Sequence, residues 1–96
     1  MHAVIRRYDY VAGPPDDLLR AYRVLAAQLS RVAGSVSYAA LHGGPGVLAS
    51  ISFFETEAEL LAAERVIGAW EAEHRGALLP RPPQVTGGEV VVQRGL

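Results

Sequence analysis

Tyrosine and histidine rings supply most of the side chains in this sequence that could bind or deprotonate a small aromatic ligand. On an extended strand, Tyr8 and Tyr10 lie on the same side as Arg6, and Tyr38 shares a side with His42. If these sides line a cavity, they form a slot for a phenol with proton donors at its edge. If they face a second subunit, they are hydrogen-bonded interface residues. Spacing alone leaves both interpretations open.

Two further ring residues, Trp70 and His74, lie one helical turn apart. Trp70 belongs to an apolar helical stripe, so it is either a core residue packed on a sheet or a pocket wall on which a planar ligand stacks. Histidine changes charge near neutral pH, so His74 could act as a general base, or it could interact with the negative end of its helix. His2 and His42 are distant from it and show no metal-ligand spacing, so we predict no zinc site.

Other residue types narrow the chemistry further. The acidic residues of the same segment are interpreted as its solvated face: Glu57, Glu64, Glu71 and Glu73. Gly43-Gly44-Pro45-Gly46 lacks the spacing and the following helix of a phosphate loop, which indicates a turn. The chain has no cysteine, which excludes disulfides and thiol catalysis. It also has no lysine or asparagine, which excludes Schiff-base catalysis and an asparagine oxyanion donor.

The composition predicts a single domain over residues 1–96. Half of the residues are hydrophobic and 20% are charged, which is incompatible with disorder. The net charge of -1 offers no basic surface for nucleic-acid phosphates. No apolar run reaches the ~18 residues that span a bilayer, and residues 1–15 lack a signal-peptide layout. We therefore expect a soluble, cytoplasmic protein with neither nucleic acid nor membrane as a partner.

Four strands are predicted from runs of aromatic and β-branched residues, over 2–11, 35–42, 47–54 and 89–94. The first helix is predicted from a cap at Asp16 or Asp17 to Gly34, with an apolar stripe made of Leu18, Tyr22, Leu25, Leu29 and Val32. The second begins at the capping box Thr56-Glu57-Ala58-Glu59 and ends at Gly76, with a stripe made of Leu60, Ala63, Ile67 and Trp70.

The element order β-α-β-β-α-β predicts a ferredoxin-like α+β fold, in which both helices cover one face of an antiparallel four-stranded sheet. The other face is also apolar, because Val90, Val91 and Val92 point to both faces. In the strand 47–54, one side carries Val47, Ala49, Ile51 and Phe53, and the other side, which is half apolar, carries Leu48, Ser50, Ser52 and Phe54. Leaving that face exposed to water would lose ~1.5–3 kcal/mol of hydrophobic stabilisation for each large apolar side chain. We expect a homodimer that buries sheet against sheet, with an apolar-faced monomer as the alternative.

Several segments together carry a resemblance to a known family. They are Val4-Ile5-Arg6-Arg7-Tyr8, the Gly43-Gly44 turn before the strand 47–54 and Glu55, Trp70, and the tail from Leu78 to Val90. Nearly the whole chain resembles the dimeric α/β-barrel superfamily, and most closely its antibiotic-biosynthesis-monooxygenase-like branch. This resemblance implies the same fold and a homodimer, whereas activity differs between members.

The resemblance also implies two candidate activities. Enzymes of the family include cofactor-independent oxygenases of phenolic, polyketide-like rings and haem-degrading oxygenases, and both use a tryptophan in the second helix that Trp70 matches. Both commonly use an asparagine, which is absent here, and the axial histidine of the haem enzymes lies further along than His74. We therefore expect no cofactor. The expected catalytic residues are His74, Trp70 and Tyr8, and the expected ligand-binding residues are Arg6, Tyr10, Tyr38 and His42.

A different class of function stays open beside the oxygenase. Every candidate residue also has a structural interpretation, and the titratable groups do not cluster along the sequence. The alternative is therefore a non-catalytic homodimeric module that binds a small ligand or serves assembly alone. An enclosed cavity of ~300 Å³ or more, bordered by Trp70 with two polar tips converging, favours a ligand site. An interior filled by Leu25, Leu29, Ile67 and Trp70 favours the structural interpretation.

Overall fold

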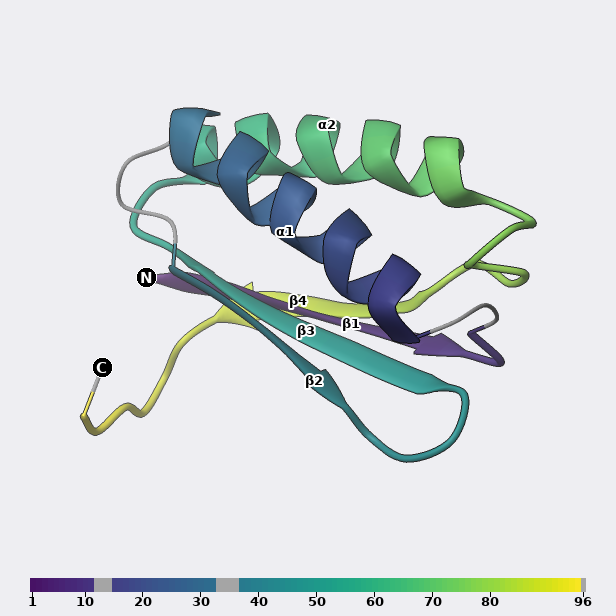
Figure 1. Ribbon diagram of the computed structural model, residues 1–96. Coiled ribbons are helices and arrows are strands. Elements are labelled where there is room, and N and C mark those ends of the chain that lie inside the picture. Colours follow the sequence, from purple (N-terminus) through teal and green to yellow (C-terminus); the bar gives the residue numbers. More distant parts are fainter. Residues whose placement is uncertain (12–14, 33–36, 96) are drawn as a thin grey trace.

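The computed structural model describes residues 1–11, 15–32 and 37–95 and has the predicted element order (Figure 1). The four strands form one antiparallel sheet in the order β2-β3-β1-β4. Its elements are β1 (His2–Asp9), α1 (Pro15–Val32), β2 (Ser37–His42), β3 (Val47–Phe54), α2 (Glu57–His74) and β4 (Gln84–Glu89). This confirms the ferredoxin-like α+β fold. No helix in the described part of the chain is long and apolar enough to cross a membrane.

The first helix begins at Pro15, one residue before its predicted cap. Proline is favoured at the first helical position because the N–H that it lacks would have no partner there. Asp16 and Asp17 therefore lie inside the first turn, where their charge meets the positive helix end. The predicted helix stop at Gly34 lies outside the described residues. The predicted apolar stripe is confirmed for its buried members Leu18, Tyr22, Leu25 and Leu29.

The second helix begins as its capping box predicts. Thr56 is the N-cap, and its hydroxyl accepts a hydrogen bond from the Glu59 amide at 3.2 Å. The same hydroxyl lies 3.2 Å from the Glu59 carboxylate and donates to it. The helix ends at His74, and Gly76 follows with a φ of +87°, in the left-handed region that favours glycine.

Strands β1 and β4 differ from their predicted bounds. The first strand ends at Asp9, because Tyr10 has a φ of +61° and leaves the extended region. The fourth strand is Gln84–Glu89, so the prediction of 89–94 is wrong. Pairing with β1 sets this limit: Glu89 pairs with His2, and only Val90 continues, through its amide to the Met1 carbonyl at 2.9 Å.

The residues after β4 therefore have no place in the sheet. Val91 and Val92 are 89% and 86% exposed, so the expectation that they contribute to both sheet faces is wrong. Strand propensity was high in this segment, but a strand needs a partner along its length and β1 has ended.

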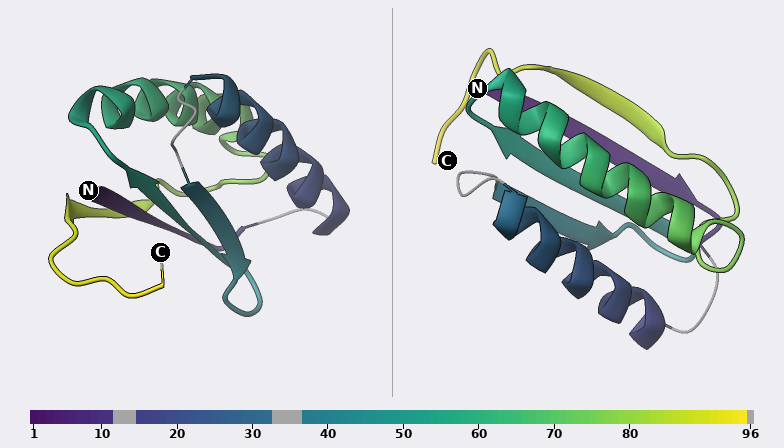
Figure 2. Two further views of the ribbon diagram at one scale, coloured as in Figure 1. Left: turned by 90° about the vertical axis from the view of Figure 1, so that its left-hand side faces the viewer. Right: turned by 90° about the horizontal axis from the view of Figure 1, so that it is seen from above.

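The second apolar face of the sheet is nevertheless present in β3. Both helices lie over one face of the sheet and leave the other open (Figure 2). On the covered face, the buried residues of β3 are Leu48, Ser50, Ser52 and Phe54. The open face carries its half-buried residues Val47, Ala49, Ile51 and Phe53. By register, Ile5 of β1 and Ala39 of β2 flank Ile51 there. The open face of β3 is thus more apolar than the covered one.

Candidate functional site

A buried arginine on the covered face of β1 binds two glutamates of α2. Arg6 Nη1 donates to Glu64 Oε1 at 2.8 Å, Nη2 donates to Glu64 Oε2, and Nε donates to Glu71 Oε1 at 3.1 Å. The side chains of Arg6, Glu64 and Glu71 are 9%, 29% and 17% exposed. Burial lowers the pKa of Arg6, but the hydrogen bond and charge of Glu64 and the charge of Glu71 outweigh it and raise that pKa above its ordinary value. Arg6 is therefore a permanent buried cation.

These contacts correct the interpretation of the acidic residues of α2. Glu57 and Glu73 are exposed as predicted, but Glu64 and Glu71 turn toward the sheet. They are seven residues apart and so lie two turns apart on one helix face. The sequence contained a signal for these buried glutamates. Arg6 alternates along its strand with Val4 and Tyr8, which point inward, and a buried guanidinium requires carboxylate partners.

Glu71 also accepts a hydrogen bond from the hydroxyl of Tyr8. Tyr8 is almost completely buried, and its burial, together with the hydrogen bond and charge of Glu71, raises its pKa well above the ordinary range of a phenol. The nearby charge of Arg6 lowers the pKa by less. Tyr8 is consequently a neutral hydrogen-bond donor near neutral pH, and Glu71 is the charged acceptor beside it.

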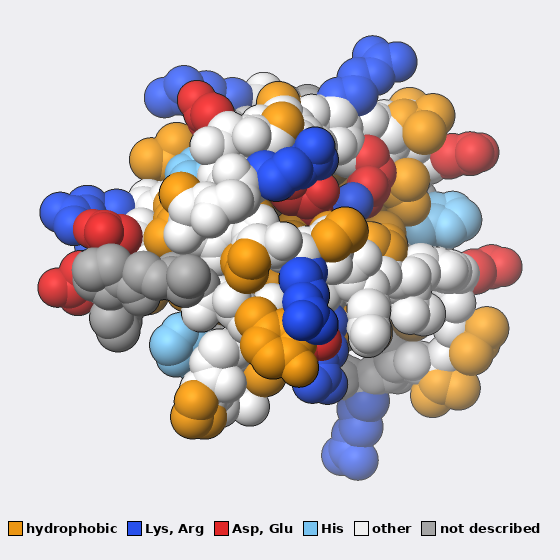
Figure 3. All heavy atoms as spheres, turned by 90° about the vertical axis from the view of Figure 1, so that its right-hand side faces the viewer, with side chains coloured by type: hydrophobic (Ala, Val, Ile, Leu, Met, Phe, Trp, Pro, Cys, Tyr) orange, Lys and Arg blue, Asp and Glu red, His pale blue; other side chains and the backbone are white. Residues whose placement is uncertain are grey.

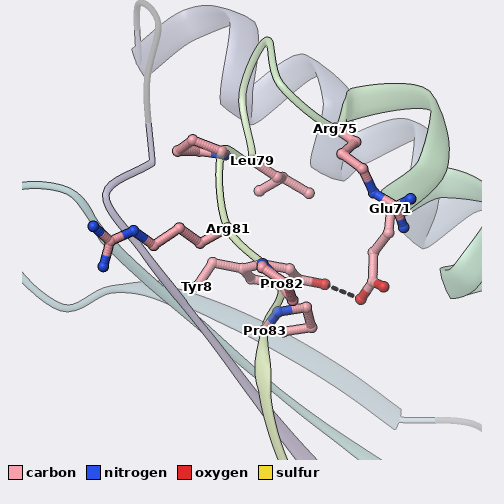
Figure 4. Close-up of a pocket in the computed structure, with 8 residues that line it drawn as sticks. Tyr8, Glu71, Arg75, Leu79, Arg81, Pro82 and Pro83 are labelled. Carbon is pink, nitrogen blue, oxygen red and sulfur yellow. Dashed lines mark hydrogen bonds between the residues drawn. The ribbon is translucent and has the colours of Figure 1, made fainter.

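A pocket of about 200 Å³ opens next to this pair. Figure 4 shows the Tyr8 hydroxyl and the Glu71 carboxylate pointing toward each other at its edge. The pocket is built by β1, the end of α2 and the segment that follows α2, and its lining residues are Tyr8, Glu71, Arg75, Leu79, Pro80, Arg81, Pro82 and Pro83. Figure 3 views the molecule from this end, where hydrophobic, acidic and basic side chains meet.

Trp70 lies in the core, behind the Tyr8–Glu71 pair. It is 2% exposed, and its indole Nε1 donates to the Ala21 carbonyl of α1 at 2.9 Å. Its ring centroid lies 5.1 Å from Tyr22 and 6.4 Å from Tyr8, in a tilted and an edge-on arrangement. Trp70 therefore joins the two helices and supports the Tyr8 ring, and it does not line the pocket.

His74 lines a groove that is separate from the pocket lined by Tyr8. Its ring lies 4.9 Å from the Trp70 ring, and its Nδ1 lies 2.8 Å from the Trp70 carbonyl. With Asp17 and Arg20, His74 lines an open groove between the two helices. His74 therefore does not line the pocket beside Glu71.

The remaining predicted residues are spread along the sheet. Tyr38 stacks on Tyr22 at 6.3 Å between ring centroids, and burial raises the pKa of Tyr38 to about 12. His42 is exposed and lines an apolar pocket of about 260 Å³ between α1 and the β2–β3 hairpin. Tyr10 is exposed beyond β1, with the Arg81 guanidinium 4.0 Å over its ring. The structure thus brings Arg6 and Tyr8 together with Glu71, while Tyr10 and His42 lie apart.

Metal ligands do not gather at this site. Across residues 1–11, 15–32 and 37–95, no three histidine, aspartate or glutamate side chains are arranged to hold a metal ion.

No family model matches the chain, and no curated protein matches it either. Its structure is similar to the NE2512 protein of unknown function from Nitrosomonas europaea, with a TM-score of 0.80 and 20% identity over 97% of this chain and 91% of that one. A putative antibiotic biosynthesis monooxygenase from the same organism has a TM-score of 0.76 and 14% identity, over 96% of this chain and 100% of that one.

A third similar structure is SnoaB, a cofactor-independent oxygenase from Streptomyces nogalater, with a TM-score of 0.63 and 16% identity over 99% of this chain and 95% of that one. At these identities the likeness concerns the fold. The chain has the ferredoxin-like fold of the antibiotic biosynthesis monooxygenases, as its sequence predicts.

Proposed function

We propose that the pocket beside Tyr8 and Glu71 binds a small phenolic, polyketide-like ligand, and that the protein oxidises it as a cofactor-independent monooxygenase. The observation that carries this proposal is the hydrogen-bonded pair of a neutral phenol and a carboxylate at the edge of a pocket. The fold shared with SnoaB supports the reaction class. Tyr8 and Arg6 were expected in the site from the sequence, and Glu71 is the residue that sequence reasoning missed.

In this proposal Glu71 accepts the proton of the ligand hydroxyl. Its bonds from Tyr8 and Arg6 both reach Oε1, which leaves Oε2 for a ligand. The resulting phenolate passes an electron to O₂, and a methylene of the ring system becomes a carbonyl while the second oxygen atom leaves as water. Tyr8 donates to negative charge on the ligand, and the apolar walls of the pocket exclude water.

The roles of the other predicted residues follow from their places. Arg6 orients Glu71, and Trp70 supports the Tyr8 ring from behind. We assign proton acceptance to Glu71 in preference to His74, because the His74 ring bonds the Trp70 carbonyl and faces the groove between the helices.

Oxygen uptake with an anthrone-type phenol tests this assignment. The parent protein should consume oxygen faster than buffer, and Glu71→Gln should lower the rate about 100-fold or more, because the base is lost. Glu73→Gln removes an exposed carboxylate two residues along the same helix and should keep the parent rate. Thermal unfolding of both variants shows whether Glu71→Gln is folded. A folded Glu71→Gln protein with the parent rate would contradict the proposal.

A second candidate is a non-catalytic dimeric module, and the packing of the interior favours it. Leu25, Leu29, Ile67 and Trp70 are each 2% exposed, so the space between helices and sheet is filled at Trp70. Under this interpretation the Arg6 network has a structural role. Absence of oxygen uptake by a folded parent protein, with every phenol tested, would favour this candidate.

For both candidates we propose a homodimer through the open face of the sheet. Ile5 is 46% exposed there, next to the half-buried Ile51, and burial of such side chains against a second copy would stabilise the assembly by ~25 cal/mol per Å².

Sedimentation should give about twice the 10.3 kDa mass of one chain at micromolar concentration. Ile51→Glu places a charge in the centre of the open face and should yield a monomer. Val24→Glu introduces the same charge at an exposed position of α1 and should leave the dimer intact. A folded, non-aggregating monomer of the parent chain at these concentrations would contradict the dimer.

A further inference from the structure

The arginines in and around the proposed pocket differ in whether a carboxylate neutralises them. Glu71 is the acidic residue of the lining, and its charge is already shared with the buried Arg6 and with Tyr8. Two more arginines, Arg75 and Arg81, lie at the rim. Among the described residues neither has a carboxylate within 4.0 Å. The rim therefore carries positive charge that the surrounding protein does not neutralise, and such a rim attracts anions.

Arg81 is already engaged by an aromatic ring. Its guanidinium lies 4.0 Å over the ring of Tyr10, and in Figure 4 it points away from the side of the pocket that holds Glu71. Arg75 lies on the Glu71 side in the same view and has no ring or ion-pair contact within the described chain. Arg75 is thus the rim cation that is available to a ligand.

The last carbonyl group of α2, next to Arg75, already has hydrogen-bond partners. Helix C-termini carry partial negative charge on carbonyl groups without partners. Here the His74 carbonyl accepts hydrogen bonds from the amides of Leu78 and Leu79, each at 3.1 Å. The turn that follows the helix therefore supplies hydrogen-bond donors to the carbonyl next to Arg75.

The size of the pocket and the spacing of Glu71 and Arg75 limit the part of the ligand that enters the pocket to one ring. A volume of about 200 Å³ is smaller than the ~300–1,000 Å³ of pockets for drug-sized ligands. Arg75 is the C-cap of α2, four residues after Glu71. The helical rise between the two Cα atoms is about 6 Å, which is comparable with the width of a substituted benzene ring. Leu79, Pro82 and Pro83 supply apolar walls for the faces of that ring.

We propose that the ligand of this pocket is a hydroxyaryl carboxylate, one ring of which enters the pocket with its hydroxyl bound to Glu71 and its carboxylate bound to Arg75. This inference rests on the proposed function and adds to it the chemical class of the ligand. A guanidinium pairs with a carboxylate through two parallel N–H···O bonds, so Arg75 supplies both charge and orientation.

Calorimetric titration of the full chain with 4-hydroxybenzoate and with its neutral methyl ester tests the inference. The acid should bind at least about tenfold more tightly than the ester, and added salt should weaken only the acid. Arg75→Gln should weaken the acid about tenfold and change the ester less than about twofold. Arg81→Gln removes the same charge from the same rim and should weaken the acid less than about threefold.

Equal affinity of the acid and the ester, or equal effects of Arg75→Gln and Arg81→Gln, would overturn the inference, as would failure of both probes to bind. Oxygen uptake separates it from the proposed function. A protein that oxidises neutral phenols without preferring the acid contradicts only the role of Arg75. A protein that binds the acid through Arg75 but consumes no oxygen with any phenol contradicts only the oxygenase.

Discussion

Replacing Arg6 with methionine is expected to lower the free energy of unfolding by about 3 kcal/mol, the lower end of the range for breaking a buried ion pair. Arg6→Met keeps most of the buried stem but leaves Glu64 and Glu71 without their cation, at 29% and 17% side-chain exposure. This remaining exposure places the expected cost at the lower end of that range, because water solvates the carboxylates in part. Urea unfolding of parent and variant measures the difference.

The adjacent arginine provides the control for this experiment. Arg7 pairs with Asp9 at 2.9 Å but is 54% exposed, so Arg7→Met should cost less than about 1 kcal/mol. Adding Glu64→Gln and Glu71→Gln to Arg6→Met should recover part of the loss, because the buried charges then disappear together. Equal costs for Arg6→Met and Arg7→Met would show that the Arg6 network contributes nothing beyond a surface ion pair.

The same network links stability to the candidate site. Arg6 and Tyr8 both bind Glu71 Oε1, so the position of that carboxylate is set by two donors from β1. In the proposed function Glu71 is a base that must be held in place before a ligand arrives, and its bonds from β1 would provide this preorganisation. The cost is a buried cluster of two carboxylates and one guanidinium, which an ordinary apolar core would avoid.

Much of the fold could be predicted because its signals are local. The spacing of Leu18, Tyr22, Leu25 and Leu29 defines one face of α1, and the Thr56 capping box marks the start of α2. Such patterns depend only on residues within a few turns of each other, so they can be read without knowing the tertiary structure.

The fourth strand and the buried glutamates could not be predicted in the same way, because their positions depend on pairing. The end of β4 is determined by where β1 begins, and strand propensity after Glu89 carries no information about that. Similarly, the inward direction of Glu64 and Glu71 depends on Arg6, 58 and 65 residues away in the sequence. For the candidate site, the tyrosine, histidine and tryptophan residues could be proposed from their residue types alone. Their partner Glu71 could be recognised only in the tertiary structure.

The second large effect is expected at Trp70. Trp70→Ala should lower the free energy of unfolding by about 3–5 kcal/mol, because it removes a buried indole that contacts Tyr8, Tyr22 and His74. Leu61→Ala, at an exposed position of the same helix, should cost less than about 1 kcal/mol. Thermal or urea unfolding of both variants measures these costs.

A milder variant separates the supporting role of Trp70 from a direct role in catalysis. Trp70→Phe retains most of the buried ring but loses the indole donor to the Ala21 carbonyl, and should cost about 1–2 kcal/mol. If Trp70 supports Tyr8 without contacting the ligand, the folded Trp70→Phe protein should retain most of its oxygen uptake, with KM close to that of the parent. A tenfold or larger fall in kcat without a matching loss of stability would contradict a purely supporting role, because the phenyl ring of the variant still packs behind Tyr8.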